Sequence, residues 1–149
     1  MKPEKIKAVY FSATGTTEKI VLSVSESLAE QFEIPLEAHD FTLPQNRETV
    51  LEFQKGDLII FGVPTYAGRV PNVLLPYMKS KLAGNGAWAV PIVLFGNRNY
   101  DDSLIELRDI LSETGFQPIA GAAFIGEHSF SYKLAAGRPD KRDMAVVEE

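Results

Sequence analysis

The amino-acid sequence predicts an α/β fold in which a five-stranded parallel sheet lies between two layers of helices. Segments with strand and helix character alternate along the 149-residue chain, without repeats or low-complexity stretches. The strongest strand candidates are nearly continuous apolar runs, which are typical of parallel strands buried on both faces. Repeated strand–helix–strand units have right-handed crossovers, so their succession builds a doubly wound, three-layer sheet.

Each predicted element has a signal of its own. Apolar runs predict five strands, over residues 6–11, 34–41, 57–63, 87–95 and 116–125. A stripe of apolar residues predicts a helix over 16–32, and further helices are expected over 73–82, 102–114 and 139–149. Gly115 follows the third of these helices, where helices commonly end. Two prolines oppose the pattern: Pro76 must kink its helix or lie in its first turn, and Pro91 fits poorly in the fourth strand.

The composition of the chain excludes several classes of function. Apolar residues make up 45% of the chain and charged residues 23%, as in a globular protein, and the length fits one domain over residues 1–149. The sequence contains no cysteine, which excludes disulfides, thiol catalysis and thiolate-bound metal within this chain. The net charge of −5 argues against a nucleic-acid partner. No apolar run approaches the ~18 residues that span a bilayer, and no cleavable signal peptide is visible, so we expect a cytoplasmic protein without a membrane partner.

The first of three unusual loops links the first strand to the first helix. In doubly wound sheets, ligands bind beyond the carboxyl ends of the strands. Here residues 12–17 carry four hydroxyl side chains, those of Ser12, Thr14, Thr16 and Thr17, together with Gly15. The glycine permits a tight turn, and the helix N-terminus offers N–H groups and the positive end of its dipole. This pattern suits a terminal phosphate held without Lys or Arg, and it equally suits an ordinary helix cap.

The second and third loops follow the third and fourth predicted strands. The second contains Pro64, Thr65, Tyr66, Ala67 and Gly68, and the third contains Gly96, Asn97, Arg98 and Tyr100. A flat ring such as flavin needs an apolar or aromatic wall and backbone hydrogen bonds at its polar edge. Each loop offers one tyrosine and at least one glycine for these purposes. Alternatively, the second loop is a rigid surface turn, and the third is a helix entry capped by Asp101 or Asp102.

In this order and on this strand pattern, the three loops resemble those of the flavodoxin family. Ser12, Thr14, Gly15 and Thr17 match the family's phosphate-loop signature, Thr/Ser-x-Thr-Gly-x-Thr, and the other two loops correspond to its two flavin-ring loops. The resemblance covers essentially the whole chain and implies a flavodoxin-like sheet of order 2-1-3-4-5. It also implies FMN as the cofactor, bound by Ser12, Thr14, Gly15, Thr16, Thr17, Pro64, Thr65, Tyr66, Ala67, Gly68, Gly96, Asn97, Arg98 and Tyr100.

Four segments resemble, more narrowly, the N-terminal flavodoxin-type domain of fused flavodoxin–ferredoxin proteins: residues 66–71, 96–100, 127–130 and 136–139. This resemblance implies a redox partner of the ferredoxin type, either a separate protein or a fused domain whose cysteines hold iron–sulfur clusters. It also implies that residues 1–149 are the N-terminal part of a longer protein, and the short predicted helix over 139–149 fits that expectation. The alternative is a stand-alone flavodoxin that ends with a short helix. Arg69 and Arg98 lie where flavodoxins are usually more acidic, and they are candidate docking charges for the partner.

The predicted function is therefore that of an FMN-binding electron-transfer domain with no catalytic residue of its own, because the flavin carries the chemistry. One alternative is an FMN-dependent NAD(P)H:quinone reductase on the same fold, which would oxidise NAD(P)H steadily when a quinone is present. Another is a cofactor-free flavodoxin-like interaction module, which would be colourless. The sequence leaves the redox potential and the oligomeric state open.

Overall fold

The computed structural model describes residues 3–12, 15–65, 69–95 and 103–125. Its larger elements are β1 (Lys5–Tyr10), α1 (Thr16–Phe32), β2 (Leu36–Asp40), β4 (Asp57–Pro64), α2 (Leu75–Ser80), β6 (Trp88–Phe95), α3 (Ser103–Glu113), β7 (Gln117–Pro118) and β8 (Ala122–Ile125). The 3₁₀ turns η1 (Pro44–Arg47) and η2 (Asn72–Leu74) and the short strands β3 (Leu51–Glu52) and β5 (Leu82–Ala83) complete the described order. Within these ranges, no helix has the length and apolar character needed to cross a membrane.

The main sheet is parallel throughout its described strands. Its order is β2-β1-β4-β6-β7, with β8 also paired to β6. When β7 and β8 are counted as two parts of the predicted fifth strand, this is the order 2-1-3-4-5 that the sequence predicted. The fold class is thereby confirmed, including the doubly wound topology. The strands β3 and β5 pair with each other as a separate two-stranded sheet that the sequence analysis did not predict.

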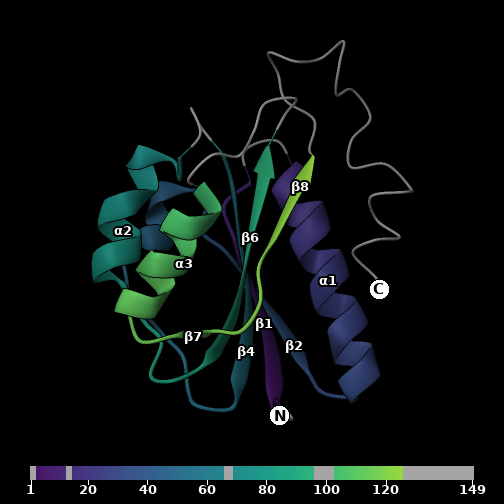
Figure 1. Ribbon diagram of the computed structural model, residues 1–149. Helices are drawn as coiled ribbons and strands as arrows, with labels where there is room; N and C mark the ends of the chain where they lie inside the picture. Colours follow the sequence, from purple (N-terminus) through teal and green to yellow (C-terminus); the bar gives the residue numbers. More distant parts are fainter. Residues whose placement is uncertain (1–2, 13–14, 66–68, 96–102, 126–149) are drawn as a thin grey trace.

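Helices cover both faces of the main sheet, so the structure has three layers (Figure 1). Along the central strands, alternate residues belong to one or the other of two apolar clusters. Ile6, Ala8 and Tyr10 of β1 belong to the cluster under α1, together with Ile20 and Val21 of that helix. Val9 and Phe11, on the opposite face, belong to the larger cluster that includes Met78 of α2 and Leu107 of α3. The prediction of strands buried on both faces is therefore confirmed, and β4 shows it most fully because residues 57–63 are all buried.

The two prolines that opposed the predicted pattern are accommodated in different ways. Pro76 lies in the first turn of α2, where its missing N–H has no intrahelical acceptor to lose. The predicted helix over 73–82 is shorter in the structure, because it opens with the 3₁₀ turn η2 and gives way to β5 at Leu82.

Pro91 accounts for the division of the predicted fifth strand into β7 and β8. On the β7 side of β6, the carbonyls of Ala87 and Ala89 accept the N–H groups of Gln117 and Ile119, at 2.8 and 2.9 Å. Pro91 is the next residue that faces the same neighbouring strand, and it has no N–H group to donate. Pairing with β7 ends at Ala89, and pairing with β8 begins at Ile92. The prediction of one continuous strand over 116–125 was therefore wrong, because Pro91 interrupts the hydrogen bonds along this side of β6.

Candidate functional site

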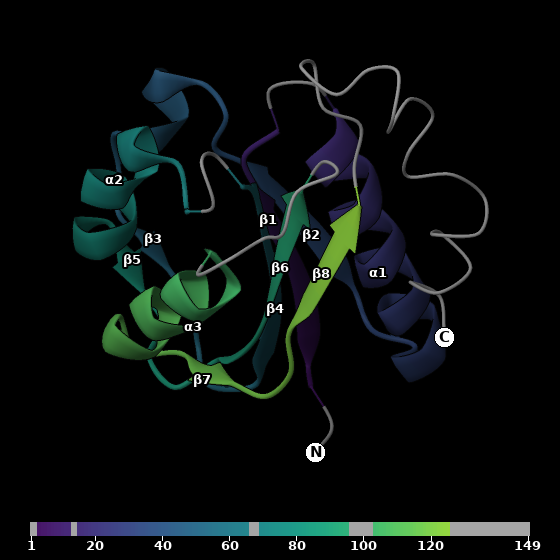
Figure 2. The ribbon, with the colours of Figure 1, turned by 45° about the horizontal axis from the view of Figure 1, so that its top comes forward.

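The three predicted loops leave the sheet at one edge. The strands β1, β4 and β6 are adjacent and parallel, and the register pairs Tyr10 with Gly62 and Pro64 with Leu94 at their carboxyl ends. Beyond this register, Phe11 N–H donates to the Gly62 carbonyl at 3.2 Å, and Thr65 N–H donates to the Leu94 carbonyl at 2.7 Å. Figure 2, which brings this edge forward, shows the ends of the three strands side by side. The sheet therefore gathers the starting points of loops that are far apart in the sequence.

The first loop leads into the N-terminus of α1. Gly15 is the N-cap residue, with a left-handed φ of 87°. Apart from its two chain neighbours, no heavy atom of the described residues lies within 4 Å of the position that a Cβ would take there. The Ser12 hydroxyl oxygen accepts the Glu18 N–H at 3.0 Å, and thereby satisfies one of the free donors of the first helical turn. Ser12 thus caps the helix, which is one of the two interpretations of this loop given above, and its hydroxyl proton can still be donated.

Thr17 has a different environment, because its side chain is only 3% exposed and lies between α1 and the sheet. It packs toward Gly62 of β4, where an added Cβ would lie 3.2 Å from the Thr17 methyl carbon and 2.2 Å from Val21 Cγ2. The absence of a side chain at residue 62 therefore lets the first turns of α1 lie close to the sheet. This close approach sets the position of the helix N-terminus relative to the strand ends.

The segment that follows β2 supports Ser12 through hydrogen bonds. The Thr42 hydroxyl oxygen accepts the Ser12 N–H at 2.9 Å and donates its own proton to Asp40 Oδ1, which also accepts the Thr42 N–H at 2.9 Å. Arg47 Nη1 donates to the carbonyls of Phe41 and Thr42, at 3.2 Å each. Sequence reasoning missed this support, since Ser12 and Thr42 lie 30 residues apart and neither belongs to a joint motif.

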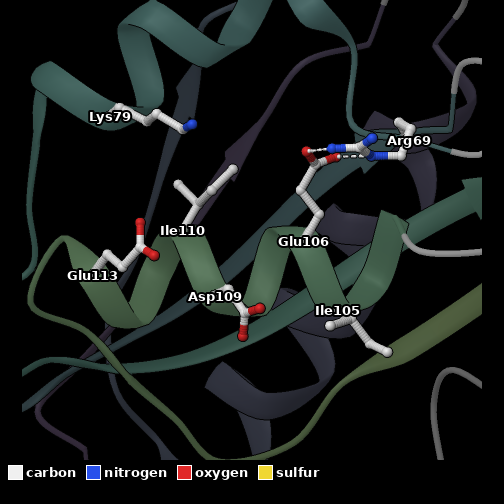
Figure 3. A pocket seen from close by; sticks show the side chains of 7 residues that line it. All are labelled: Arg69, Lys79, Ile105, Glu106, Asp109, Ile110 and Glu113. Atoms are coloured by element: carbon white, nitrogen blue, oxygen red, sulfur yellow. Dashed lines mark hydrogen bonds and ion pairs between the residues drawn. The ribbon is translucent and has the colours of Figure 1, made fainter.

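The flanks of the second and third loops are tied together by α3. Thr65, at the end of β4, and Ser103, the first residue of α3, share a hydrogen bond of 2.9 Å between their buried hydroxyls. One helical turn later, the Glu106 carboxylate binds both Arg69 and Val70. Its Oε1 accepts the Val70 N–H at 2.8 Å and Arg69 Nε at 3.2 Å, while Oε2 accepts Arg69 Nη2 at 2.5 Å (Figure 3).

The electrostatics of Glu106 follow from these contacts. Its side chain is 15% exposed, and burial alone raises the pKa of a carboxyl group. The hydrogen bonds from Arg69 and from the Val70 N–H act in the opposite direction and prevail, so the pKa of Glu106 is held below its usual value. Arg69, predicted as a docking charge, keeps an exposed side chain but shares its guanidinium with this carboxylate.

A groove of about 390 Å³ lies beside this ion pair, between α2 and α3. Figure 3 shows Lys79 reaching across from α2, while Glu106 extends from α3 to Arg69. The lining carries charges of both signs, from Arg69, Lys79, Glu106, Asp109 and Glu113, with Ile105 and Ile110 between them. The groove therefore shows no preference for a ligand of one charge.

Of the predicted cofactor-binding residues, the structure describes Ser12, Gly15, Thr16, Thr17, Pro64 and Thr65. It brings them to the shared strand edge: Ser12 and Gly15 lie between β1 and α1, Thr16 and Thr17 begin α1, and Pro64 and Thr65 lie at the end of β4 and directly after it. The remaining eight lie outside the described residues: Thr14, Tyr66, Ala67, Gly68, Gly96, Asn97, Arg98 and Tyr100. The predicted helix over 139–149 lies outside them as well.

Solved structures of similar architecture identify the fold. A flavodoxin from the domain Archaea has a TM-score of 0.67 and 14% sequence identity, with 97% of this chain and 91% of that chain covered. The fold is that of the flavodoxins. Two-electron reduced flavodoxin from Megasphaera elsdenii gives a TM-score of 0.61 at 15% identity, over 96% of this chain and 97% of that one.

Part of a larger protein has the same fold. Rubredoxin oxygen:oxidoreductase from Desulfovibrio gigas matches with a TM-score of 0.62 and 15% identity over 99% of this chain, which spans only 34% of that protein. No protein-family model matches the chain, and no curated protein matches its sequence significantly. The flavodoxin-like fold predicted from the sequence is thus confirmed by structural similarity.

Proposed function

We propose that this chain is an FMN-binding domain that transfers electrons. The observation that carries the proposal is that three loops start side by side at one edge of a flavodoxin-like sheet, from the adjacent strands β1, β4 and β6. In doubly wound sheets, this edge is where ligands bind. The first loop has the composition of a phosphate site, and the other two have that of a flavin-ring site.

The described residues fit the phosphate end of FMN. The helix α1 is 17 residues long and presents its N-terminus at this edge, where N–H groups and the helix dipole favour an anion. Among the described residues other than its chain neighbours, none comes within 4 Å of a Cβ position at Gly15, which leaves room for an oxygen ligand. Ser12 lies shortly before this N-terminus, and Thr16 and the buried Thr17 are the first two residues of α1. A phosphate would be held by neutral donors and a helix dipole, without a lysine or arginine in residues 12–17.

The role of the protein follows from this fit. The bound flavin would accept and release electrons, and the chain would set its affinity and potential through stacking, hydrogen bonds and nearby charge. We assign the flavin ring to the loops after β4 and β6, with Tyr66 and Tyr100 as stacking residues. An iron–sulfur protein or fused domain of the ferredoxin type is the proposed partner. This assignment is supported by the segments over 66–71, 96–100, 127–130 and 136–139, which resemble fused flavodoxin–ferredoxin proteins.

Paired titrations with FMN and riboflavin test the phosphate site. Flavin fluorescence would be followed in wild-type protein, in Thr14→Val and in Thr114→Val. The last variant makes the same exchange at the far end of α3, where Thr114 donates its hydroxyl proton to the Ile110 carbonyl. We expect wild type to prefer FMN strongly, Thr14→Val to lose more affinity for FMN than for riboflavin, and Thr114→Val to bind as wild type does. Equal wild-type affinities for the two flavins would refute the phosphate assignment.

Electron transfer is tested separately with the FMN-loaded protein. We expect a reduced ferredoxin-type protein to reduce the bound flavin, observed as bleaching of its visible absorbance. Steady oxidation of NAD(P)H in the presence of a quinone would favour the reductase alternative instead. Protein that binds neither flavin would leave only the cofactor-free interaction module.

A further inference from the structure

Two side chains of α3 hold both ends of the segment that contains residues 66–68. At its entry, Ser103 is hydrogen-bonded to Thr65, and both side chains are buried, with exposures of 0% and 8%. At its exit, Glu106 accepts hydrogen bonds from Arg69 and from the Val70 N–H. Val70 is itself 1% exposed and belongs to the core cluster. The entry and exit of this segment are therefore fixed to one rigid element.

The spacing on α3 makes this arrangement possible. Ser103 and Glu106 are three residues apart, so they lie on the same face of the helix, one turn apart. The same helix begins directly after residues 96–102, which contain the predicted third loop. One helical turn therefore connects the second loop to the third, although the hydrogen bonds that do so span 36 to 38 residues.

We propose that Glu106, with Ser103, is a positioning residue that fixes the two flavin-ring loops relative to each other. This inference rests on the proposed function, since it assumes that a flavin ring binds between these loops. Glu106 touches neither the flavin nor the phosphate loop in this scheme. It contributes to affinity by holding the second loop in its binding conformation before the ligand arrives, which lowers the entropic cost of binding.

The carboxylate is better suited to this task than its amide. Its two oxygens accept three N–H groups, and one of these donors belongs to the buried Val70 backbone. Glutamine at position 106 would keep an acceptor for Val70 but turn an NH₂ group toward the Arg69 guanidinium, which is also a donor. Alanine would remove every acceptor and leave a buried N–H without a partner. The variants Glu106→Gln and Glu106→Ala therefore form a graded series.

The test measures FMN and riboflavin affinities of wild type, Glu106→Gln, Glu106→Ala, Ser103→Ala and Glu113→Ala, at a temperature where circular dichroism shows each to be folded. Glu113→Ala is the matched control, because Glu113 lies on the same helix and lines the same groove, without a hydrogen bond or ion pair to the other described residues. We expect Glu106→Ala to weaken both flavins by the same factor, about tenfold, equivalent to ~1.4 kcal/mol. Glu106→Gln and Ser103→Ala should show smaller losses, and Glu113→Ala none.

Comparing FMN with riboflavin distinguishes the positioning role of Glu106 from other effects of its replacement. A ring-loop defect must affect FMN and riboflavin equally and change the absorbance spectrum of the bound flavin, because both share the ring. A loss confined to FMN, or wild-type affinities in Glu106→Ala, would overturn the inference and leave the proposed function intact. If wild type binds neither flavin, the proposed function itself fails. Should Glu106→Ala not fold, Glu106→Gln carries the test, with a loss for both flavins expected and an unchanged affinity contradicting it.

Discussion

Replacing Gly62 with alanine tests how closely α1 must approach the sheet. A Cβ on Gly62 would lie 2.2 Å from Val21 Cγ2, whereas ordinary van der Waals contact begins at 3.4 Å. The helix or the strand must therefore shift by the difference, 3.4 − 2.2 = 1.2 Å, unless Val21 changes its rotamer. Val21 is fully buried, and a β-branched side chain in a helix has one strongly preferred rotamer, so a change of rotamer is costly.

The expected magnitude follows from two opposing effects. Overpacking a well-packed core costs about 1–3 kcal/mol. Alanine in a strand gains about 0.5–1 kcal/mol over glycine because glycine loses more backbone entropy on folding. We therefore expect Gly62→Ala to lower the free energy of unfolding, by up to about 2.5 kcal/mol. Because Thr17 also contacts this position, the displaced first turn of α1 should weaken FMN binding more than riboflavin binding.

Urea denaturation followed by circular dichroism measures the change in stability. Gly121→Ala is the control, because its Cβ would meet neighbours only at 3.4 Å or beyond. In a double-mutant cycle, the cost of Gly62→Ala should shrink in a Val21→Ala background, since the obstructing methyl group is gone. A stabilised Gly62→Ala protein, or a cost that Val21→Ala leaves unchanged, would show that steric contact at residue 62 does not set the helix position.

Three further outcomes follow from described contacts. Gly84→Ala should cost more than Gly62→Ala, about 3 kcal/mol, because its Cβ would lie 2.5 Å from the backbone nitrogen of Phe116, which cannot rotate away; an unchanged urea midpoint would contradict this. Lys7→Met should lower the free energy of unfolding by about 1–3 kcal/mol, since it leaves the Asp57 carboxylate, 11% exposed and 3.3 Å from Lys7 Nζ, without its cation. Thermal unfolding would measure this loss, and an equal melting temperature would refute it. The lowered pKa of Glu106 means that its ionised form stabilises the fold above the pKa it has when unfolded, and that this contribution is lost as pH falls through the lower folded pKa. Stability of Glu106→Gln, measured by urea unfolding across acidic pH, should therefore fall less steeply than that of wild type, and parallel curves would contradict the assignment.

Strong local patterns explain why much of the fold could be predicted. The helix over 16–32 has the same bounds in the structure, because an amphipathic stripe and a glycine N-cap define it locally. The strand over 57–63 differs from β4 by one residue, because a fully buried apolar run has few alternatives. The strands β3 and β5 were missed, since two residues are too short for any period to show.

The candidate site could be predicted only in part, for a related reason. Loops at strand ends are visible in a sequence, because strands and turn residues mark them. The side chains that support those loops are not: Glu106 reaches a backbone N–H 36 residues away, and Thr42 one that is 30 residues away. Such contacts depend on which elements the fold brings together, and one sequence alone carries no signal for them.

The proline in β6 also has a consequence for local stability, because it separates the pairing of β6 with β7 from its pairing with β8. Because Pro91 supplies no N–H, no hydrogen-bonded ladder runs from β7 into β8, and each short strand is joined to β6 by its own bonds. Proteins open locally in contiguous cooperative units, which differ in the free energy that opening costs. We therefore expect β8 to detach from β6 without releasing β7 and Ile119, because the N–H groups of Gln117 and Ile119 have their own acceptors on β6. Amide hydrogen exchange would then show two different levels of protection within residues 116–125, which the sequence predicts to form a single strand.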